Sequence, residues 1–110
     1  MALYLYTANY TLDAVKAMIK EPQDREAAAR KAVTAAGGKM QLFFAALGSF
    51  DVGIIAEFSD DTDMAAVSLV VGAAGGVTNG TTTRLLSSSE FTEAMTKAGR
   101  IMESYSPPQG

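Results

Sequence analysis

The turn Gly48-Ser49-Phe50-Asp51, followed by the run Val52-Gly53-Ile54-Ile55-Ala56-Glu57-Phe58, decides the fold class of this chain. Strand-like apolar sequence lies on both sides of the turn, over residues 39–47 and 51–58. Because the connection is short, the two strands are predicted to pair antiparallel. Ser59-Asp60-Asp61 comes directly after the second strand, and a capping side chain followed by acids is typical of a helix start. The stretch therefore predicts a hairpin that leads into a helix.

Upstream of this hairpin, the alternation of side chains over residues 2–9 predicts a strand. Helical spacing begins after Thr11, a plausible N-cap, and Pro22 divides the helical region in two. Gly37-Gly38 then ends the second helical stretch, as glycine does at C′ positions. This half of the chain is predicted to be a strand, a divided helix and the first strand of the hairpin.

Downstream, residues 64–74 are almost all apolar and predict a well-buried helix. A Thr-rich strand is expected over residues 77–86, with a possible bulge at Gly80. Ser87 and Glu90 match a capping box, which predicts a last helix over about residues 88–105 before a polar tail at 106–110. Apolar residues of this last helix recur along one stripe: Phe91, Met95, Ala98, Met102 and Tyr105.

The order strand, helix, strand, strand, helix, strand predicts an α+β fold, a ferredoxin-like βαββαβ sandwich. Right-handed crossovers place both helices on one face of a four-stranded antiparallel sheet. The last helix is an addition to this unit. Residues 1–110 are expected to form one domain, with its core in residues 2–86.

Composition excludes several classes of function. The chain has 110 residues, a net charge of −3 and 48% hydrophobic residues, and no basic stripe is visible, so nucleic acid is not an expected partner. It has no Cys and no His, which removes the usual ligands of transition metals and haem, and no metal or cofactor is expected. No signal peptide or membrane segment is recognisable, and a cytoplasmic location is the expectation.

At these residues the sequence resembles the GYD family, named for a Gly-x-Tyr-Asp turn. Gly48-Ser49-Phe50-Asp51 stands at that turn with Phe in place of Tyr, so the hydroxyl of the family motif is absent. The resemblance also covers Tyr10-Thr11, Arg25, Gly37-Gly38, the strand over 52–57 and Asp60-Asp61. It implies a ferredoxin-like fold of the dimeric α/β-barrel group, in which two open sheet faces meet, and it implies little about activity.

Four residues are candidates for ligand binding: Tyr4, Tyr6, Glu57 and Arg84. Alternation puts the two tyrosines on the face of the first strand away from Leu3 and Leu5, and we assign them to the open face. They could line a pocket there, although a dimer interface is favoured because Tyr is enriched in interfaces. Glu57, predicted on the same face, could act as a base with a raised pKa, but pairing with Arg84 is the favoured interpretation.

The turn residues Gly48, Phe50 and Asp51 are expected to be structural, with the Asp51 side chain bonded to nearby backbone. Arg25 could form an anion site, but a solvated or helix-pairing arginine is the more common situation.

Three functions remain open. The first is a small oligomeric protein that binds a small molecule at or near the open sheet face. The second is a cofactor-independent enzyme, an isomerase or monooxygenase type acting on a small apolar or aromatic substrate, and it rests on fold analogy alone. The third is a purely structural oligomer. Self-association to a homodimer or higher oligomer is expected in each case, because an apolar open sheet face, predicted to carry Tyr4, Tyr6, Phe43 and Ile55, must be covered.

Overall fold

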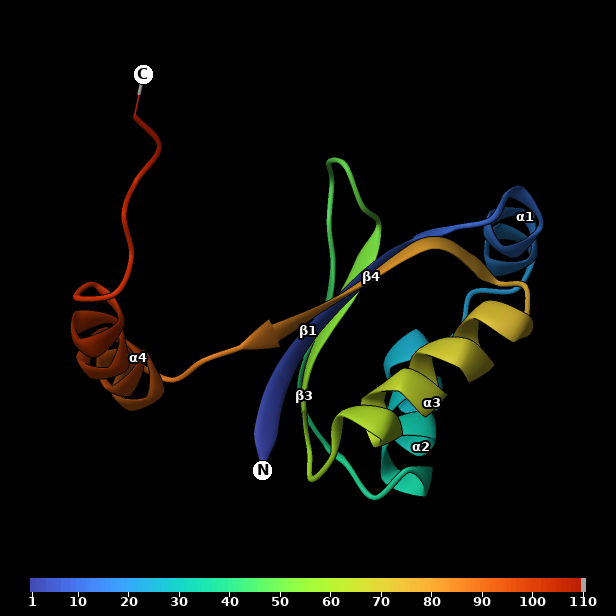
Figure 1. Ribbon diagram of the computed structural model, residues 1–110. Helices are drawn as coiled ribbons and strands as arrows, with labels where there is room; N and C mark the ends of the chain where they lie inside the picture. The colour runs from blue at the N-terminus through green and yellow to red at the C-terminus, as the bar shows by residue number, and fades with distance from the viewer. Residues whose placement is uncertain (110) are drawn as a thin grey trace.

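The computed structural model describes residues 1–109, and within them the chain forms four strands and four helices (Figure 1). Gly110, the last residue of the predicted polar tail, lies outside the described residues. The elements, in chain order, are β1 (Ala2–Tyr10), α1 (Leu12–Lys20), α2 (Arg25–Ala35), β2 (Lys39–Ala45), β3 (Val52–Phe58), α3 (Asp61–Ala73), β4 (Val77–Leu85) and α4 (Ser88–Ile101).

The four strands form one antiparallel sheet in the order β2-β3-β1-β4. Strands β1 and β3 are central, and each helical crossover connects two strands that are consecutive in sequence but not adjacent in the sheet. Figure 1 shows α2 and α3 together on one side of this sheet. The predicted ferredoxin-like α+β fold is confirmed.

Each helix begins at a residue whose side chain accepts a hydrogen bond from a free backbone N–H group. Thr11, Asp24, Asp60 and Ser87 fill these positions for α1, α2, α3 and α4. The predicted capping box is complete, since Glu90 also accepts from the Ser87 N–H at 2.9 Å. The starts of α1, α3 and α4 were readable from local sequence, because a cap depends only on residues within one turn, whereas α2 begins at Arg25 after the cap Asp24, two residues later than the predicted start at Gln23.

The sheet face covered by α2 and α3 contains the hydrophobic core. Val52, Ile54, Ala56 and Phe58 face the helices, as predicted, and all four are buried. The helices contribute Val33 of α2 and Met64 and Val67 of α3 to the same buried cluster.

Tyr4 and Tyr6 also face the helices, and the prediction that they lie on the open face was wrong. They pair with Ala56 and Ile54 across the β1–β3 ladder, and both tyrosines are buried. The physical reason is that β1 is apolar on both faces. Alternation separates its tyrosines from its leucines but does not say which set meets the helices. The register with β3 decides this.

The opposite face, which we call the open sheet face, is covered by no element of the chain's ferredoxin-like unit. Its apolar members are only half-buried or exposed: Leu3, Leu5, Leu42, Phe44 and Ile55. The Phe44 ring lies where a Cβ atom at Gly53 would stand, so the ring packs directly against the backbone of the glycine. Thr81 and Thr83 of β4 extend the same face with polar side chains.

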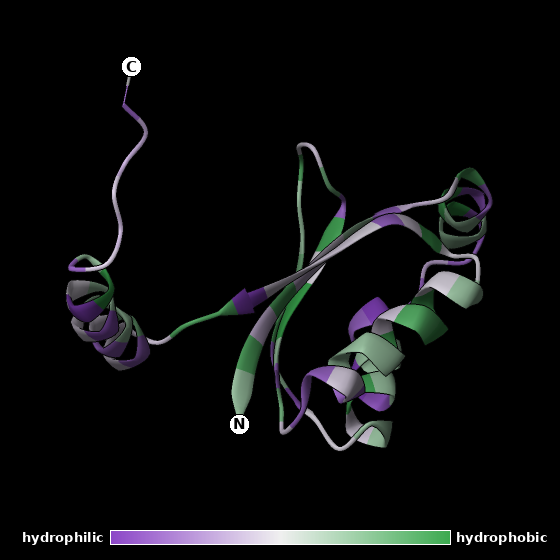
Figure 2. Cartoon of the chain, in the orientation of Figure 1, coloured by the Kyte–Doolittle hydropathy of each residue, from purple (hydrophilic) through white to green (hydrophobic). Residues whose placement is uncertain are grey.

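Two helices are less buried than the sequence suggested. Only Met64 and Val67 of α3 are buried, whereas Leu69 and Val70 lie exposed on its outer side, so the prediction of a well-buried helix holds for one face alone. Helix α4 ends at Ile101, short of the predicted residue 105, and none of its residues is buried. Figure 2 shows that α4 mixes apolar and polar residues, as an amphipathic helix does.

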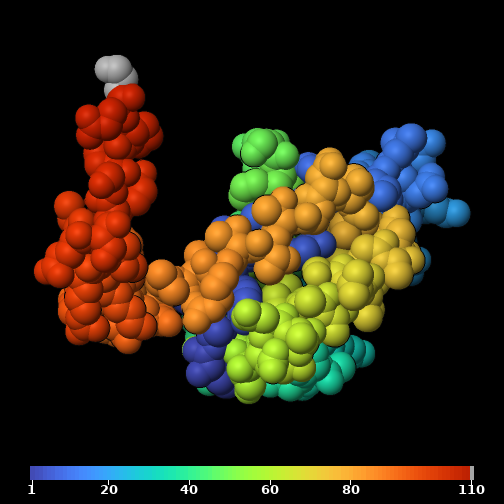
Figure 3. Space-filling view, viewed as in Figure 1, coloured from blue at the N-terminus to red at the C-terminus, as the bar shows by residue number. Residues whose placement is uncertain are grey.

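Helix α4 stands apart from the rest of the molecule. Figure 3 shows α4 and the following segment as a separate lobe, joined to the sheet by a thin connection after β4. The radius of gyration is 18.0 Å, whereas a compact chain of this length would have about 13 Å. The projecting helix accounts for this difference.

Candidate functional site

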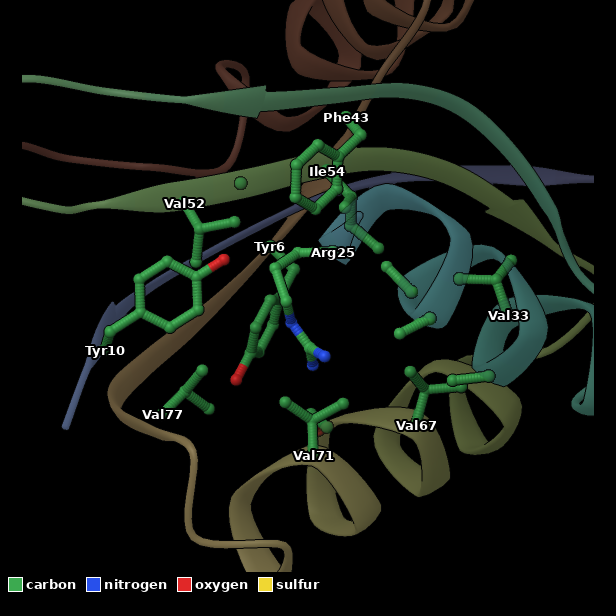
Figure 4. A pocket seen from close by; sticks show the side chains of 15 residues that line it. Tyr6, Tyr10, Arg25, Val33, Phe43, Val52, Ile54, Val67, Val71 and Val77 are labelled. Atoms are coloured by element: carbon green, nitrogen blue, oxygen red, sulfur yellow. The ribbon is translucent and has the colours of Figure 1, made fainter. Parts of the chain in front are cut away.

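An apolar cavity lies between the sheet and the two covering helices. Its volume is about 130 Å³. The walls come from the helix-facing sides of β1 and β3, from Phe43 of β2, and from one side each of α2 and α3 (Figure 4). An engineered cavity of roughly 150 Å³ binds benzene, so this space suits a molecule of similar size.

Most of the lining is aliphatic, and small residues on α2 keep the space open. Ala28, Ala29 and Ala32 present only methyl groups where longer side chains would fill the cavity. Val33, Val67 and Val71 close the side formed by the helices. A site of this kind recognises an apolar ligand body by shape and burial.

Polar groups gather at one end of the cavity. Figure 4 shows Tyr6, Tyr10 and the guanidinium of Arg25 near one another, beside Val77, whereas Val33 and Val67 lie at the other end. Three hydrogen-bond donors of this type, one of them permanently charged, are suited to a ligand with an acceptor or anionic group.

The Tyr6 hydroxyl is accommodated by a bulge in β4. The β1–β4 register shifts between Thr7 and Asn9, and Asn79 has a positive φ of 54°. An ideal Cβ at Gly80 would lie 2.5 Å from the Tyr6 hydroxyl oxygen, so a larger residue would collide with it. The predicted bulge at Gly80 is confirmed, and it makes room for a side chain of the cavity.

Tyr10 is held in place by the residue that ends the Gly48–Asp51 turn. The Asp51 Oδ2 atom accepts hydrogen bonds from the Tyr10 backbone N–H at 3.0 Å and from the Asn9 side-chain amide at 3.2 Å. The Asp51 backbone N–H donates to the Ala8 carbonyl oxygen at 3.0 Å. The Asp51 side chain thus accepts a hydrogen bond from a backbone N–H group, as predicted. That group belongs to Tyr10 at the end of β1 and not to the turn itself.

The tyrosines of the cavity are donors at neutral pH. Burial raises the pKa of Tyr6 above its usual 10.0. Burial also raises the pKa of Tyr10, with a further contribution from the Asp51 carboxylate, while the positive charge of Arg25 opposes the shift. Both hydroxyls therefore stay protonated and can donate a hydrogen bond.

Arg25 lies at the start of α2, directly after the cap Asp24, and its Nη1 atom donates to Gln23 Oε1 at 2.9 Å. The ion pairs found among residues 1–109 join Arg30 to Glu26, Arg84 to Glu90 and Lys97 to Glu93, and none includes Arg25. Its charge is available to a ligand. From the sequence, Arg25 was a possible anion site, but a solvated or helix-pairing arginine was favoured, because a single arginine in a helix carries no signal of a cavity.

The four predicted ligand residues do not form one cluster. Only Tyr6 lines the cavity. The Tyr4 hydroxyl donates to Asp61 Oδ1 at the start of α3, which raises the pKa of Tyr4, and its ring meets Phe58 edge-on with centroids 5.9 Å apart.

Glu57 and Arg84 lie on opposite faces of the sheet, so the predicted pairing between them was wrong. Glu57 stands opposite Leu3 on the open sheet face, whereas Arg84 stands opposite Tyr4 on the helix-facing side. The Arg84 guanidinium carbon lies 5.8 Å from the centre of the Tyr4 ring, and its Nη2 atom is 3.4 Å from Glu90 Oε2. A ligand-binding role for Tyr4, Glu57 or Arg84 stays a prediction.

Sequence reasoning missed Tyr10 and Phe43 as cavity residues. Tyr10 continues the series Tyr6, Ala8, Tyr10 on one face of β1, which was a usable signal once that face was known to meet the helices. The prediction that Phe43 lies on the open sheet face with Ile55 was wrong, because an irregularity of β2 between Met40 and Leu42 changes which residues share a face and places Phe43 opposite Ile54.

The described residues contain no group of three or more Asp, Glu, His or Cys side chains placed to hold a metal ion. No helix within residues 1–109 combines the length and the apolar character that crossing a membrane requires.

Comparison with solved structures supports the fold. A transcriptional regulator from Neisseria meningitidis, solved as its complex with L-Met, matches with a TM-score of 0.56 at 19% identity, over 79% of this chain and 51% of that one. The chain thus spans about half the length of the regulator. At this identity, the match shows a shared fold.

Two further structures match less closely. A protein from Agrobacterium tumefaciens gives a TM-score of 0.47 at 15% identity, over 78% of this chain and 92% of that one. A NIPSNAP-like domain protein from Burkholderia xenovorans gives 0.48 at 13% identity, over 99% and 90%. No significant match was found among curated proteins.

The family model of the GYD domain matches residues 4–95, which run from Tyr4 in β1 through the other three strands and helices α1, α2 and α3 to the middle of α4. The match extends through the Gly48–Asp51 turn and through every element that lines the cavity. The chain belongs to the GYD domain family.

Proposed function

We propose that this protein binds a small molecule with an apolar body and one anionic or hydrogen-bond-accepting end, a small aromatic or branched carboxylate being the class that fits best. The observation that supports the proposal is the division of the cavity into an aliphatic end and an end with Arg25, Tyr6 and Tyr10. A carboxylate can accept from the guanidinium and from both hydroxyls, and hydrogen bonds to charged groups are the stronger ones.

The binding site differs from the one expected from the sequence, which was placed at or near the open sheet face. The cavity is on the helix-facing side, where the body of a ligand would be enclosed by two layers. An open sheet face offers only a shallow contact area, and small-molecule sites are usually concave.

Binding is favoured over catalysis because no group of the cavity is suited to remove a proton at neutral pH. The raised pKa values keep Tyr6 and Tyr10 protonated, and Ser68 donates its hydroxyl proton to the Ala65 carbonyl oxygen at 2.9 Å. A cofactor-independent isomerase or monooxygenase would need a base or an activated nucleophile close to its substrate.

Titration calorimetry with benzoate, and with benzyl alcohol as the uncharged analogue, tests the proposal. We expect benzoate to bind more tightly, and Arg25→Gln to reduce its affinity by about 10-fold or more, since a charged hydrogen bond contributes roughly 1.5–3 kcal/mol. Lys31→Gln removes the same charge from the exposed side of α2 and is expected to leave binding unchanged.

A second variant tests the location of the site. Ala29→Leu would place an isobutyl group in the cavity and should abolish binding of both probes while the far-UV circular dichroism stays that of the folded protein. Equal benzoate affinity in wild type, Arg25→Gln and Ala29→Leu would contradict the proposal. Mass spectrometry of the recovered probe gives the enzyme alternative its own test, since turnover would change the probe.

Self-association through the open sheet face is the second part of the proposal, together with a cytoplasmic location. Leu3, Leu5, Leu42, Phe44 and Ile55 form an apolar area that a monomer leaves in water. Patches of this kind in soluble proteins usually mark an interaction surface. Sedimentation velocity should show a dimer or larger species at micromolar concentration, and a monomer at that concentration would contradict this part.

A further inference from the structure

A second cavity adjoins the first at its polar end. Its walls come from α1, from the last turns of α3 and from the segment that leads into α2, and its volume is about 320 Å³. Four residues line both cavities: Tyr10, Arg25, Val71 and Val77. We call the cavity between the sheet and the helices the inner cavity, and this second space the outer cavity. The shared residues form the junction between them.

Helix α1 gives the outer cavity an apolar wall. The residues of α1 that line it are spaced three or four positions apart, on one side of the helix: Ala14, Ala17 and Met18. The start of α1 is fixed in place by Thr11, whose backbone N–H donates to the Gly76 carbonyl oxygen and whose hydroxyl donates to the Gly75 carbonyl oxygen, both at 3.0 Å. These bonds tie α1 to the loop after α3 and so hold this wall of the cavity in position.

One side of α3 runs past both cavities. Val67 lines the inner cavity, Val71 lines both, and Ala74 lines the outer one. Steps of four and three residues stay on the same side of a helix. At a rise of about 1.5 Å per residue, Val67 to Ala74 covers roughly 10 Å. A molecule lying along this side of α3 would pass from one cavity into the other over a continuous aliphatic surface.

The only permanently charged side chain of either lining lies at the junction. It is Arg25, and its Nη1 atom donates to Oε1 of Gln23, a residue of the outer cavity, at 2.9 Å. The Gln23 side-chain amide in turn donates to the Glu21 carbonyl oxygen at 3.3 Å. A neutral amide thus holds the guanidinium without cancelling its charge. An anion bound at Arg25 would have apolar space on two sides.

We propose that the ligand is a branched carboxylate, whose carboxylate binds at Arg25 and whose α-carbon carries two apolar substituents. A compact aromatic or branched group occupies the inner cavity, and an alkyl chain extends into the outer cavity. Val70 of the outer cavity is 63% exposed, so the end of the chain can reach the solvent. This inference rests on the function proposed above and adds the second substituent, which no ligand confined to the inner cavity would have.

Titration calorimetry with phenylacetate and with α-butyl-phenylacetate tests the second substituent. Each methylene that becomes fully buried strengthens binding by up to about 4-fold, so the butyl compound should bind about 10-fold or more tightly than phenylacetate. Its two enantiomers should also differ in affinity by about 3-fold or more. Only one of them can place the phenyl group, the carboxylate and the butyl chain in their three positions at once.

Filling the outer cavity should remove this gain alone. Ala14→Leu adds an isobutyl group to its wall without lowering helix propensity. It should weaken binding of the preferred enantiomer by about 10-fold, while the affinity for phenylacetate stays within about 2-fold of wild type. Ala17→Leu, at a more exposed position of the same wall, should act in the same direction. Ala66→Leu is the matched control, because this exposed residue of α3 lines neither cavity.

The outcomes separate this inference from the function on which it rests. Phenylacetate binding that depends on Arg25, combined with a butyl compound that binds no more tightly, would overturn the second substituent and leave the proposed function standing. So would a loss of equal size for both acids in Ala14→Leu, or no loss in either leucine variant of α1. Failure of both acids to bind the wild-type protein would contradict the proposed function as well.

Discussion

The two faces of the central strand β1 are both largely apolar, yet they end in different surroundings. Tyr4 and Tyr6 are enclosed by α2, α3 and the neighbouring strands, while Leu3 and Leu5 remain half-exposed on the other side. The enclosed face holds the core and a cavity with polar groups at one end. The open face has no partner within the chain. Burial in this fold is thus decided by which face the crossover helices cover, and only secondarily by how apolar the residues are.

The comparison also explains why the tyrosines occupy the enclosed face. Each has a hydroxyl that needs a partner or a wet edge when its ring is buried. The start of α3 offers Asp61 to Tyr4, and the β4 bulge at Gly80 leaves space for the hydroxyl of Tyr6. The leucine side chains have no polar group that needs a hydrogen-bond partner, so Leu3 and Leu5 can lie on the face that the chain itself leaves uncovered.

The largest difference between the faces should appear when one large side chain is removed from each. Phe58 is completely buried beside Tyr4, so Phe58→Ala should reduce the free energy of unfolding by about 3–5 kcal/mol. Ile55→Ala on the open face should cost less than about 2 kcal/mol in the monomer, because its side chain is already partly in water. Urea denaturation at low protein concentration measures both, and equal losses would contradict the assignment of the faces.

Adding a methyl group beneath the Phe44 ring on the open sheet face should reduce the free energy of unfolding by an intermediate amount. An ideal Cβ at Gly53 would lie 2.5 Å from the Phe44 ring, so Gly53→Ala must displace the ring or the strand and should cost about 1–3 kcal/mol. Gly72→Ala in α3 is the matched control. No atom lies within 4 Å of a Cβ there, and alanine should stabilise the helix by up to about 1 kcal/mol. Unchanged stability of Gly53→Ala would show that Phe44 does not rest on this position.

Alkaline pH should affect the enclosed face selectively. The pKa of Tyr4 is raised mainly by its hydrogen bond to Asp61, and those of Tyr6 and Tyr10 mainly by burial. A pKa that is higher in the folded state gives stability that is complete below the unfolded value near 10.0 and is lost as the pH rises through the folded value.

The urea midpoint should therefore stay constant between about pH 7 and 9 and fall above pH 10. Tyr6→Phe should reduce the steepness of this fall by roughly one third, since it removes one of three contributing groups. Tyr105→Phe, beyond the end of α4, should leave the steepness unchanged. A profile that is flat to pH 12 would contradict the burial of the phenols.

The smallest effect is expected for Glu57→Gln on the open face. Glu57 stands opposite Lys39 on one side and Leu3 on the other, and it is not among the residues that line the cavity between the sheet and the helices. A half-exposed charge of this kind contributes about 0–1 kcal/mol, so the variant should unfold within 1 kcal/mol of wild type. A loss of 3 kcal/mol or more in the oligomer would indicate that Glu57 is buried with a charged partner between copies.

The sequence by itself determined the order of the elements, the helix start within Ser59-Asp60-Asp61, the capping box at Ser87, the closing glycine at Gly37 and the bulge near Gly80. Each of these depends on residues within a few positions of one another, so the local chain carries the whole signal. The ferredoxin-like topology followed from that order, because crossover handedness leaves few ways to arrange the strands.

Only the tertiary structure decided which face of β1 is enclosed, that Glu57 and Arg84 lie on opposite sides, and that Arg25 meets Tyr6 and Tyr10 at one cavity. All three depend on strand register and on contacts between residues distant in sequence, where a shift of one position exchanges the faces of a strand. The projection of α4 belongs with them. Its stripe was visible in the sequence, but a periodic pattern says that a helix needs a partner surface and not where in space that surface lies.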